Sequence, residues 1–233
     1  MKAKDTLIGV GLYSFAEAAR LLGINPSKLN RWLKGYNFKG ISYQPLWDAE
    51  VVLDDGDKFL GFRDLIELKV AIEFVKLGVS ANKIRRAIEL SRELFQESYP
   101  LTADKFKTDG KNIFIKIMEE NDGGKIEERI INTFKRQYEF SRIIDRSLQW
   151  VDFDENRIPT QWWPLGKNKN ILVDPGRAFG QPIEKESGVP TAILAQAAND
   201  VGIKSAAEIY DVSNEAIKRA LEFEKNLDEK IAA

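Results

Sequence analysis

The order of apolar and polar residues predicts a chain built mostly from amphipathic helices. Between residues 14 and 34, apolar side chains recur every three or four positions, the spacing of one helix face. The pattern divides into two short helices. Their inward residues are expected to be Phe15, Ala16, Ala19 and Leu22 in the first helix and Leu29, Trp32 and Leu33 in the second.

The ends of these two helices carry recognisable signals. Ser14 and Glu17 have the spacing of a capping box, which marks a helix start. Gly23 tolerates the positive φ that a sharp turn requires. Pro26 suits the first position of a second helix, with Asn25 as its cap. The segment therefore predicts a helix-turn-helix.

A small hairpin and a helix pair are expected next. Short β-type runs surround the turn signal "DDGD", which predicts a hairpin, or wing, that ends near Leu60. Residues 62–77 then show helical spacing up to Gly78, and Ser80 caps a further helix. In that helix, the spacing places Ile84, Ile88 and Leu94 inward and Lys83, Arg85, Arg86 and Arg92 outward.

The middle of the chain predicts both strand and helix. Residues 105–118 contain an Asp-Gly turn signal followed by apolar alternation, which predicts a strand. Its alternating residues are Ile113, Ile115 and Ile117. Residues 125–148 read as a single helix, acidic at its start and basic at its end. Residues 149–165 predict an aromatic hairpin, in which Trp162 and Trp163 are expected to be buried, although an exposed interface patch is the alternative.

The C-terminal part repeats the helical theme after a candidate linker, "GKNKN", at residues 166–170. Two strands, 171–173 and 181–183, are expected around a tight turn, "DPGRAFG". Three helices are then expected to start near Pro190, Ser205 and Ser213. The predicted fold class is mainly α with small β elements (α+β), with a helix-turn-helix near each end.

Composition limits the chemistry, because the chain has neither cysteine nor histidine. This excludes disulfides, zinc fingers, thiolate nucleophiles and the Ser-His-Asp relay. The acidic clusters that could hold a magnesium ion are Asp54, Asp55, Asp57, Asp152, Asp154 and Glu155. They fall in turn-like sequences where solvated carboxylates are common. We expect no enzyme activity, no cofactor and no metal site; a carboxylate-dependent hydrolase is the alternative.

The sequence shows no sign of a membrane segment. No apolar run approaches the length of a membrane span, which is about 20 residues. The N-terminus lacks the pattern of a signal peptide. We therefore expect a cytoplasmic protein without a membrane partner.

Charge is balanced overall but not locally. The net charge is −1, so nucleic-acid binding would need a local basic patch. Residues 14–39 hold one acidic side chain, Glu17, against five basic ones. The basic residues of this stretch are Arg20, Lys28, Arg31, Lys34 and Lys39. Residues 171–233 are acidic, with seven basic and eleven acidic side chains.

The second helix of the first helix-turn-helix is the candidate DNA reader, because such helices place their N-terminal turns in the major groove. Its outward candidates are Ser27, Lys28, Asn30, Arg31 and Lys34. Arg85 and Arg86 are candidates for contacts with backbone phosphates. The alternative is a helical core with a solvated basic face, since this geometry is also a packing motif.

Two family resemblances follow from these motifs. "YSFAEAARLLGINPSKLNRWLKGY", "PLW" and "FLGFRDLIELKVAIEFVKLGVSANKIRRAI" together resemble the MerR-like winged helix-turn-helix at the N-terminus of VapB-type antitoxins. The resemblance covers about the first 95 residues. Within it, "GVSANKIRRAI" is similar to the "G-x-S-x-x-x-I" start of the second helix pair in MerR proteins.

The C-terminal part resembles a small helix-turn-helix domain of unknown function that is often encoded beside toxins. The matching residues are Asp174, Pro175, Gly180, Pro182, Val189, Pro190, Glu208, Ile209, Tyr210, Val212, Ser213, Ala220, Leu221 and Phe223. The sequence departs from the pattern at Gly188, where arginine is usual, and at Phe179, where glycine is common.

Together the resemblances imply the antitoxin of a type II toxin–antitoxin pair. Such a protein binds its own promoter as double-stranded DNA and neutralises a cognate toxin, here a PIN-domain ribonuclease. A homodimer is expected, because helix-turn-helix proteins pair to match two half-sites. The alternative is an interaction or dimerisation protein that sequesters a partner without binding DNA. The expected domains are 1–98 for DNA binding, 99–170 as a connecting segment with a dimer or toxin interface, and 171–233 as the antitoxin-associated domain.

Overall fold

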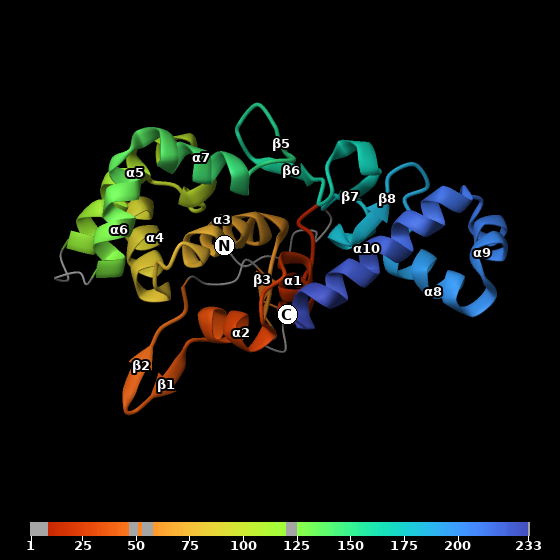
Figure 1. Ribbon diagram of the computed structural model, residues 1–233, viewed down its shortest axis with the longest axis horizontal. Helices are drawn as coiled ribbons and strands as arrows, with labels where there is room; N and C mark the ends of the chain where they lie inside the picture. The colour runs from red at the N-terminus through yellow and green to blue at the C-terminus, as the bar shows by residue number, and fades with distance from the viewer. Residues whose placement is uncertain (1–8, 47–50, 53–57, 120–124, 233) are drawn as a thin grey trace. The chain divides into compact units, whose positions relative to one another are not determined.

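The computed structural model describes residues 9–46, 51–52, 58–119 and 125–232, and it confirms the predicted fold class. Helices dominate and the strands are short (Figure 1). The chain divides into two compact units. Unit 1 contains residues 1–26, 51–62 and 150–233, and unit 2 contains residues 27–50 and 63–149.

Unit 2 holds one hairpin and most of the central helices. Its elements are α2 (Pro26–Lys34), β1 (Tyr36–Phe38), β2 (Ile41–Tyr43), α3 (Phe62–Lys76), α4 (Ala81–Phe95), η1 (Pro100–Thr102), α5 (Asp104–Glu119), α6 (Lys125–Lys135) and α7 (Gln137–Ser147). The border between the units falls within the first turns of α2 and α3.

Five phenylalanines from four helices form the centre of unit 2. They are Phe74 of α3, Phe106 and Phe114 of α5, Phe134 of α6 and Phe140 of α7. All five are fully buried, and the centroids of neighbouring rings lie 4.6 to 6.3 Å apart. Most pairs meet edge to face or tilted, the arrangements that aromatic quadrupoles favour.

The strand predicted around residues 113–117 is wrong, because this segment lies in α5. Ile113, Phe114, Ile117 and Met118 are buried at helical spacing. The Asp-Gly turn also does not form. Gly110 instead lies within the helix, where a Cβ would come within 2.6 Å of the Phe106 ring.

The helix pair of unit 2 follows the prediction only in part. Ser80 caps α4 as expected, and its hydroxyl accepts from the Lys83 N–H. Ile84 and Ile88 are buried, but Leu94 is 60% exposed and Phe95 takes the inward position.

The single helix expected at 125–148 is two helices, α6 and α7, which are separated at Arg136, where the backbone is extended.

Unit 1 joins the N-terminal helix to the C-terminal third of the chain. Its elements are α1 (Phe15–Leu22), β3 (Val51–Val52), β4 (Lys58–Phe59), β5 (Val151–Phe153), β6 (Pro159–Trp162), η2 (Lys167–Lys169), β7 (Ile171–Val173), η3 (Ala178–Gly180), β8 (Pro182–Glu184), α8 (Thr191–Val201), α9 (Ile203–Tyr210) and α10 (Asn214–Ala232).

The C-terminal part of unit 1 begins with a four-stranded antiparallel sheet of order β5-β6-β7-β8. The candidate linker 166–170 is a turn inside this sheet, because β6 pairs with β7 across it. Trp162 and Trp163 are buried, as expected. The turn predicted at "DPGRAFG" also forms, with the Asp174 carboxylate accepting from the Gly176 N–H at 2.8 Å.

The single hairpin expected before Leu60 is two separate strand pairs. β1 pairs with β2 in unit 2, and β3 pairs with β4 in unit 1. The turn at Asp54, Asp55 and Asp57 lies outside the described residues.

The signals at the ends of α1 are confirmed. The Ser14 N–H donates to Glu17 Oε2 at 2.8 Å, and the Glu17 N–H donates to Ser14 Oγ at 3.2 Å. Gly23 ends the helix with φ of 61°. The inward face is shifted from the prediction: Ala16 is exposed, and the buried residues are Phe15, Ala18, Ala19 and Leu21.

The borders of the compact units differ from the boundaries expected after residues 98 and 170. Residues 99–149 belong to unit 2 with α3 and α4, and residues 150–170 belong to unit 1 with the C-terminal helices. The division into functional domains stays a prediction.

Two ionisable side chains of α3, Glu67 and Lys69, have pKa values shifted by the packing of unit 2. The Glu67 side chain is fully buried, and its Oε1 accepts from the Leu101 N–H at 2.8 Å. Burial raises the pKa of Glu67 to about 8, although hydrogen bonds from Leu101 and Thr102 and the charge of Arg92 lower it. The Lys69 ammonium donates to the Ser147 carbonyl, and burial lowers the pKa of Lys69 to about 8.

Candidate nucleic-acid interface

The candidate reading helix, α2, has one clearly buried face. Leu29, Trp32 and Leu33 are at most 5% exposed, as the sequence pattern predicted. The Leu46 N–H donates to the Trp32 carbonyl at 2.7 Å, which ties the segment after the hairpin to the end of the helix. These contacts fix which side of α2 faces outward.

The outward side carries the predicted DNA-binding residues. Ser27, Asn30, Arg31 and Lys34 are exposed, and Lys28 is half-buried. The Lys28 ammonium lies 5.4 Å from the centroid of the Trp32 ring. That separation is within the range of a cation–π contact. The helix contains three cations and no acidic residue, so its own charge is positive. The DNA contact itself stays a prediction.

A tight hairpin follows the helix directly (Figure 1). β1 and β2 are joined by the two-residue turn Lys39-Gly40, in which both residues have positive φ. Such turns match the twist of paired strands. The Arg31 guanidinium lies 5.8 Å from the ring of Tyr36, the first residue of β1, and Lys39 is exposed at the tip.

Arg85 and Arg86, on α4, differ in how their donors are used. Arg85 Nε donates to the Pro45 carbonyl at 2.8 Å, and another of its nitrogens donates to the Gln44 carbonyl. Arg85 therefore holds the segment that follows the hairpin. Arg86 is exposed and lies 3.8 Å from the Glu89 carboxylate. Phosphate contact by either residue stays a prediction.

Arg20 is engaged elsewhere, although it contributes to the basic stretch in the sequence. Its guanidinium forms ion pairs with Glu224 at 2.6 Å and Asp228 at 2.8 Å, both on α10. Burial lowers the pKa of Arg20, but the hydrogen bonds to these two carboxylates outweigh burial and raise it. The remaining cations of the stretch belong to unit 2, whereas Arg20 belongs to unit 1.

Two of the acidic residues considered as metal ligands, Asp152 and Asp154, accept hydrogen bonds that stabilise the β5–β6 hairpin. Asp152 accepts from the Trp163 indole at 2.8 Å and from Lys167 at 2.7 Å. Burial raises the pKa of Asp152, but these hydrogen bonds outweigh it and lower the pKa. Asp154 accepts two backbone N–H groups of its own turn. Within the described ranges, no cluster of three acidic residues is placed to hold a metal ion.

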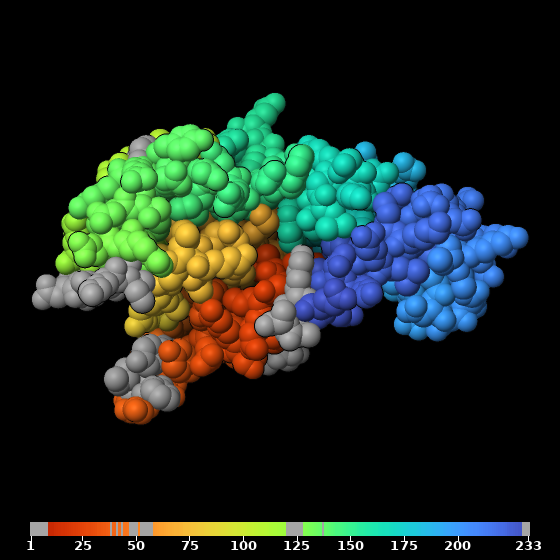
Figure 2. All heavy atoms as spheres, in the orientation of Figure 1, coloured from red at the N-terminus to blue at the C-terminus, as the bar shows by residue number. Residues whose placement is uncertain are grey.

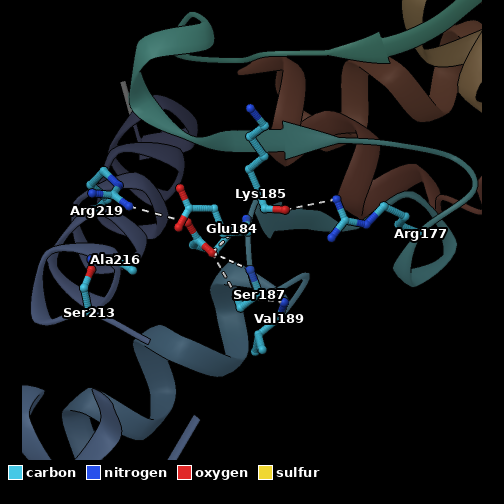
Figure 3. A network of polar contacts seen from close by, with 9 residues as sticks. Arg177, Glu184, Lys185, Ser187, Val189, Ser213, Ala216 and Arg219 are labelled. Carbon is cyan, nitrogen blue, oxygen red and sulfur yellow. Dashed lines mark hydrogen bonds and ion pairs between the residues drawn. The ribbon is translucent and has the colours of Figure 1, made fainter. Parts of the chain in front are cut away.

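A polar network organises the turn before α8 (Figure 3). The buried Glu184 carboxylate accepts from Ser187, and its other oxygen lies 3.5 Å from Arg219 of α10. Gly188 has φ of 73°, and a Cβ there would lie 2.7 Å from the Arg177 guanidinium. A cation therefore lies beside the position where the resembled family has arginine.

The other departure from that family pattern, Phe179, adopts a left-handed conformation with φ of 53°, and its side chain is 64% exposed. Glycine is common at such positions because it adopts positive φ without steric cost.

Two residues beside the candidate helix are not among the predicted DNA contacts, although Lys39 is counted in the basic stretch. Tyr36 faces Arg31, and Lys39 lies at the hairpin tip. The Lys39-Gly40 pair between two short β-type runs indicates this hairpin in the sequence, but the prediction placed the turn at the longer "DDGD" motif instead.

Among the described helices, none is long and apolar enough to cross a membrane.

The fold has a solved counterpart. The crystal structure of Rv2018 from Mycobacterium tuberculosis matches with a TM-score of 0.67 and 22% identity, over 92% of this chain and 99% of that one. By sequence, the chain is similar to the Mycobacterium tuberculosis protein named "Putative antitoxin VapB45". Identity is 26% over 226 residues, which cover 91% of this chain and 93% of that relative. No protein-family model matches the sequence.

Proposed function

We propose that this chain is the antitoxin of a type II toxin–antitoxin pair and that it represses its own promoter. The observation that carries the proposal is the likeness to a protein named as an antitoxin over 91% of the chain. The likeness spans both compact units, so it concerns the whole described architecture and not one helix-turn-helix alone. The proposed role is regulatory and non-enzymatic, and the proposed location is the cytoplasm.

DNA binding is assigned to α2 and the hairpin after it. The helix exposes Asn30, Arg31 and Lys34 on the side opposite its buried residues, and it has no acidic side chain. Asparagine and arginine suit bidentate contacts with adenine and guanine edges, and lysine suits phosphates. Because the whole chain has a net charge of −1, this local surface supplies the attraction.

Toxin neutralisation is the second half of the proposal. It is supported by the name of the relative and by the resemblance of both ends of the chain to antitoxin-associated domains. The proposed toxin is a PIN-domain ribonuclease, and the proposed state on DNA is a homodimer that matches two half-sites.

A second candidate function is a partner-sequestering protein that does not bind DNA. The ion pairs of Arg20 favour it, since they commit one of the five cations of the N-terminal stretch to α10. The net charge of residues 171–233 also opposes contact between that part and phosphates.

Fluorescence anisotropy with the DNA upstream of the gene separates the two functions. Arg31→Ala with Lys34→Ala should raise the Kd at least about tenfold at ~100 mM salt. The slope of log K against log salt should also become shallower, by roughly 0.9 for each phosphate that the variant no longer neutralises.

The matched control removes two exposed cations from α5, through Lys105→Ala with Lys116→Ala. It should leave the Kd unchanged. Equal losses in both double variants, or no loss in the first, would refute the assignment of α2. For toxin neutralisation, the chain should restore growth when the protein encoded by the adjacent gene is expressed with it.

A further inference from the structure

An apolar groove runs between α8 and α9 in unit 1. It has a volume of about 430 Å³, and its apolar lining comes mainly from Ile193, Ala197, Val201, Ile209 and Tyr210. Ile193 is 44% exposed, Val201 48% and Ile209 64%. Figure 2 shows α8 and α9, in blue, at the surface of unit 1.

The three exposed aliphatic residues of the groove, Ile193, Val201 and Ile209, are not part of the core of the helix trio, whereas Ala197 and Tyr210 pack against that core. That core is formed by Leu194, Ala198, Ala206, Ala207, Ile217 and Ala220. On α8, Leu194 and Ala198 face inward and Ala197 packs against the same core, whereas Ile193 and Val201 extend the apolar side of the helix onto the exposed surface. Exposed aliphatic residues that continue beyond the packed side of a helix are typical of a binding surface.

The charge around the groove disfavours nucleic acid. Residues 191–211 contain one basic side chain, Lys204, against three exposed acidic ones. Asp200 lines the groove itself, and Glu208 and Asp211 directly precede and follow the lining residues Ile209 and Tyr210 in the chain. The sequence of α2, by contrast, contains three cations and no acidic residue. Phosphates would therefore be repelled at the α8–α9 groove.

The same charge disfavours a second copy of this chain. In a two-fold dimer the groove would meet an identical groove, and acidic residues would face acidic residues. An apolar helix bordered by lysine or arginine satisfies both features, since its apolar side chains fill the groove and its cations meet the acidic border.

We propose that the α8–α9 groove binds an amphipathic helix of a partner protein, with an apolar face bordered by lysine or arginine. The proposal rests on the proposed function in one respect, namely that the partner is the toxin. The C-terminal helix-turn-helix is then a protein-binding module, and DNA binding is left to α2.

Two synthetic helical peptides, each roughly 18 residues long, test the groove with the full chain. Both carry leucines at positions i, i+3, i+4 and i+7, and their borders carry lysine and arginine in one and glutamate in the other. In fluorescence anisotropy, the basic peptide should bind at least about tenfold more tightly than the acidic one.

Val201→Asn with Ile209→Asn should weaken binding of the basic peptide at least about tenfold, because the change places polar groups on an apolar contact surface without adding charge. Leu94→Asn is the matched control, since Leu94 is a comparably exposed aliphatic residue on α4 of unit 2. It should not change binding. Equal binding of the two peptides, or equal loss in the control, overturns the proposal.

Sedimentation and growth rescue complete the test. If the wild-type chain is a dimer that the groove variant converts to a monomer, a second copy occupies the groove and the proposal fails. Loss of rescue by the groove variant, with DNA binding intact, supports it. Rescue by the groove variant overturns the groove assignment but leaves the antitoxin function standing. Failure of rescue by the wild type counts against the proposed function, while the peptides still decide the groove.

Discussion

The buried Glu67 carboxyl should make the stability of this protein fall as the pH rises through the neutral range. Burial raises its pKa in the folded chain from 4.5 to about 8. Between these values the folded state holds a proton that the unfolded state has lost, so raising the pH favours unfolding. The stabilising effect of this proton is complete below pH 4.5 and is lost as the pH passes 8.

The size of the effect follows from the width of this interval. Each pH unit within it changes the unfolding free energy by about 1.4 kcal/mol. The change in pKa from 4.5 to about 8 therefore corresponds to roughly 5 kcal/mol. Lys69 titrates on the other side, because its pKa is lowered from 10.5 to about 8. Its effect raises stability with pH above 8, so the two windows are separate.

The perturbation is Glu67→Gln, which keeps the side-chain shape and removes the titration. Urea unfolding followed by circular dichroism, from pH 4.5 to 8.5, gives the difference in unfolding free energy between variant and wild type. This difference should grow in favour of the variant by about 5 kcal/mol across the range. Glu93→Gln, at an exposed position of α4, should show no such growth. A difference that stays constant with pH for Glu67→Gln would refute the reasoning.

Two further substitutions probe the packing of each unit by thermal or urea unfolding. In unit 2, the Cβ added by Gly110→Ala would meet the Phe106 ring at 2.6 Å. The variant should be destabilised by about 1–3 kcal/mol. Adding Phe106→Leu should reduce that penalty, and simple additivity would contradict the contact. In unit 1, the Tyr13 hydroxyl donates to the buried Gly180 carbonyl at 2.8 Å. Tyr13→Phe should therefore cost about 1–3 kcal/mol. The control residue, Tyr138 on α7, is 75% exposed. Tyr138→Phe should change stability by less than about 0.5 kcal/mol.

The parts of the fold that the sequence predicts correctly depend on local chemistry. Ser14 and Glu17 cap α1 through side chain–backbone bonds that span three residues. Leu29, Trp32 and Leu33 lie on one helical face, so their spacing alone determines which side of α2 faces outward. The exposed candidates of the DNA-binding site were therefore predictable as a set, while their contact with DNA stays a prediction.

The errors arise where a local signal is overruled by packing. The Asp109-Gly110 pair favours a turn, yet the missing Cβ of Gly110 is what lets the Phe106 ring lie against α5. On α4, the inward position after Ile88 is taken by a polar residue, Ser91, which hides the continuation of the face to Phe95. For this reason the apolar spacing predicts Leu94, and not Phe95, as the next inward residue.

Contacts between residues far apart in the chain could not be predicted from the local sequence pattern. The pattern groups Arg20 with the cations of the candidate interface, because no residue near it in the sequence indicates an acidic partner. Its partners on α10 lie 204 and 208 positions further along the chain. The role of Arg85 in holding the carbonyls of Gln44 and Pro45 likewise required three-dimensional information.

Unit 1 is built from segments that are far apart in the chain, and this affects when it can fold during synthesis on the ribosome. Arg20 and Glu224 are separated by 204 positions in the chain. Because a ribosome adds roughly 5–20 residues per second, the partner of Arg20 is synthesised roughly 10–40 s after Arg20 itself. Over that interval α1 has been made but its partners on α10 do not yet exist. A nascent chain that stops before α10 therefore lacks the acidic partners of Arg20, and unit 1 can close only after residues 224–228 have been synthesised.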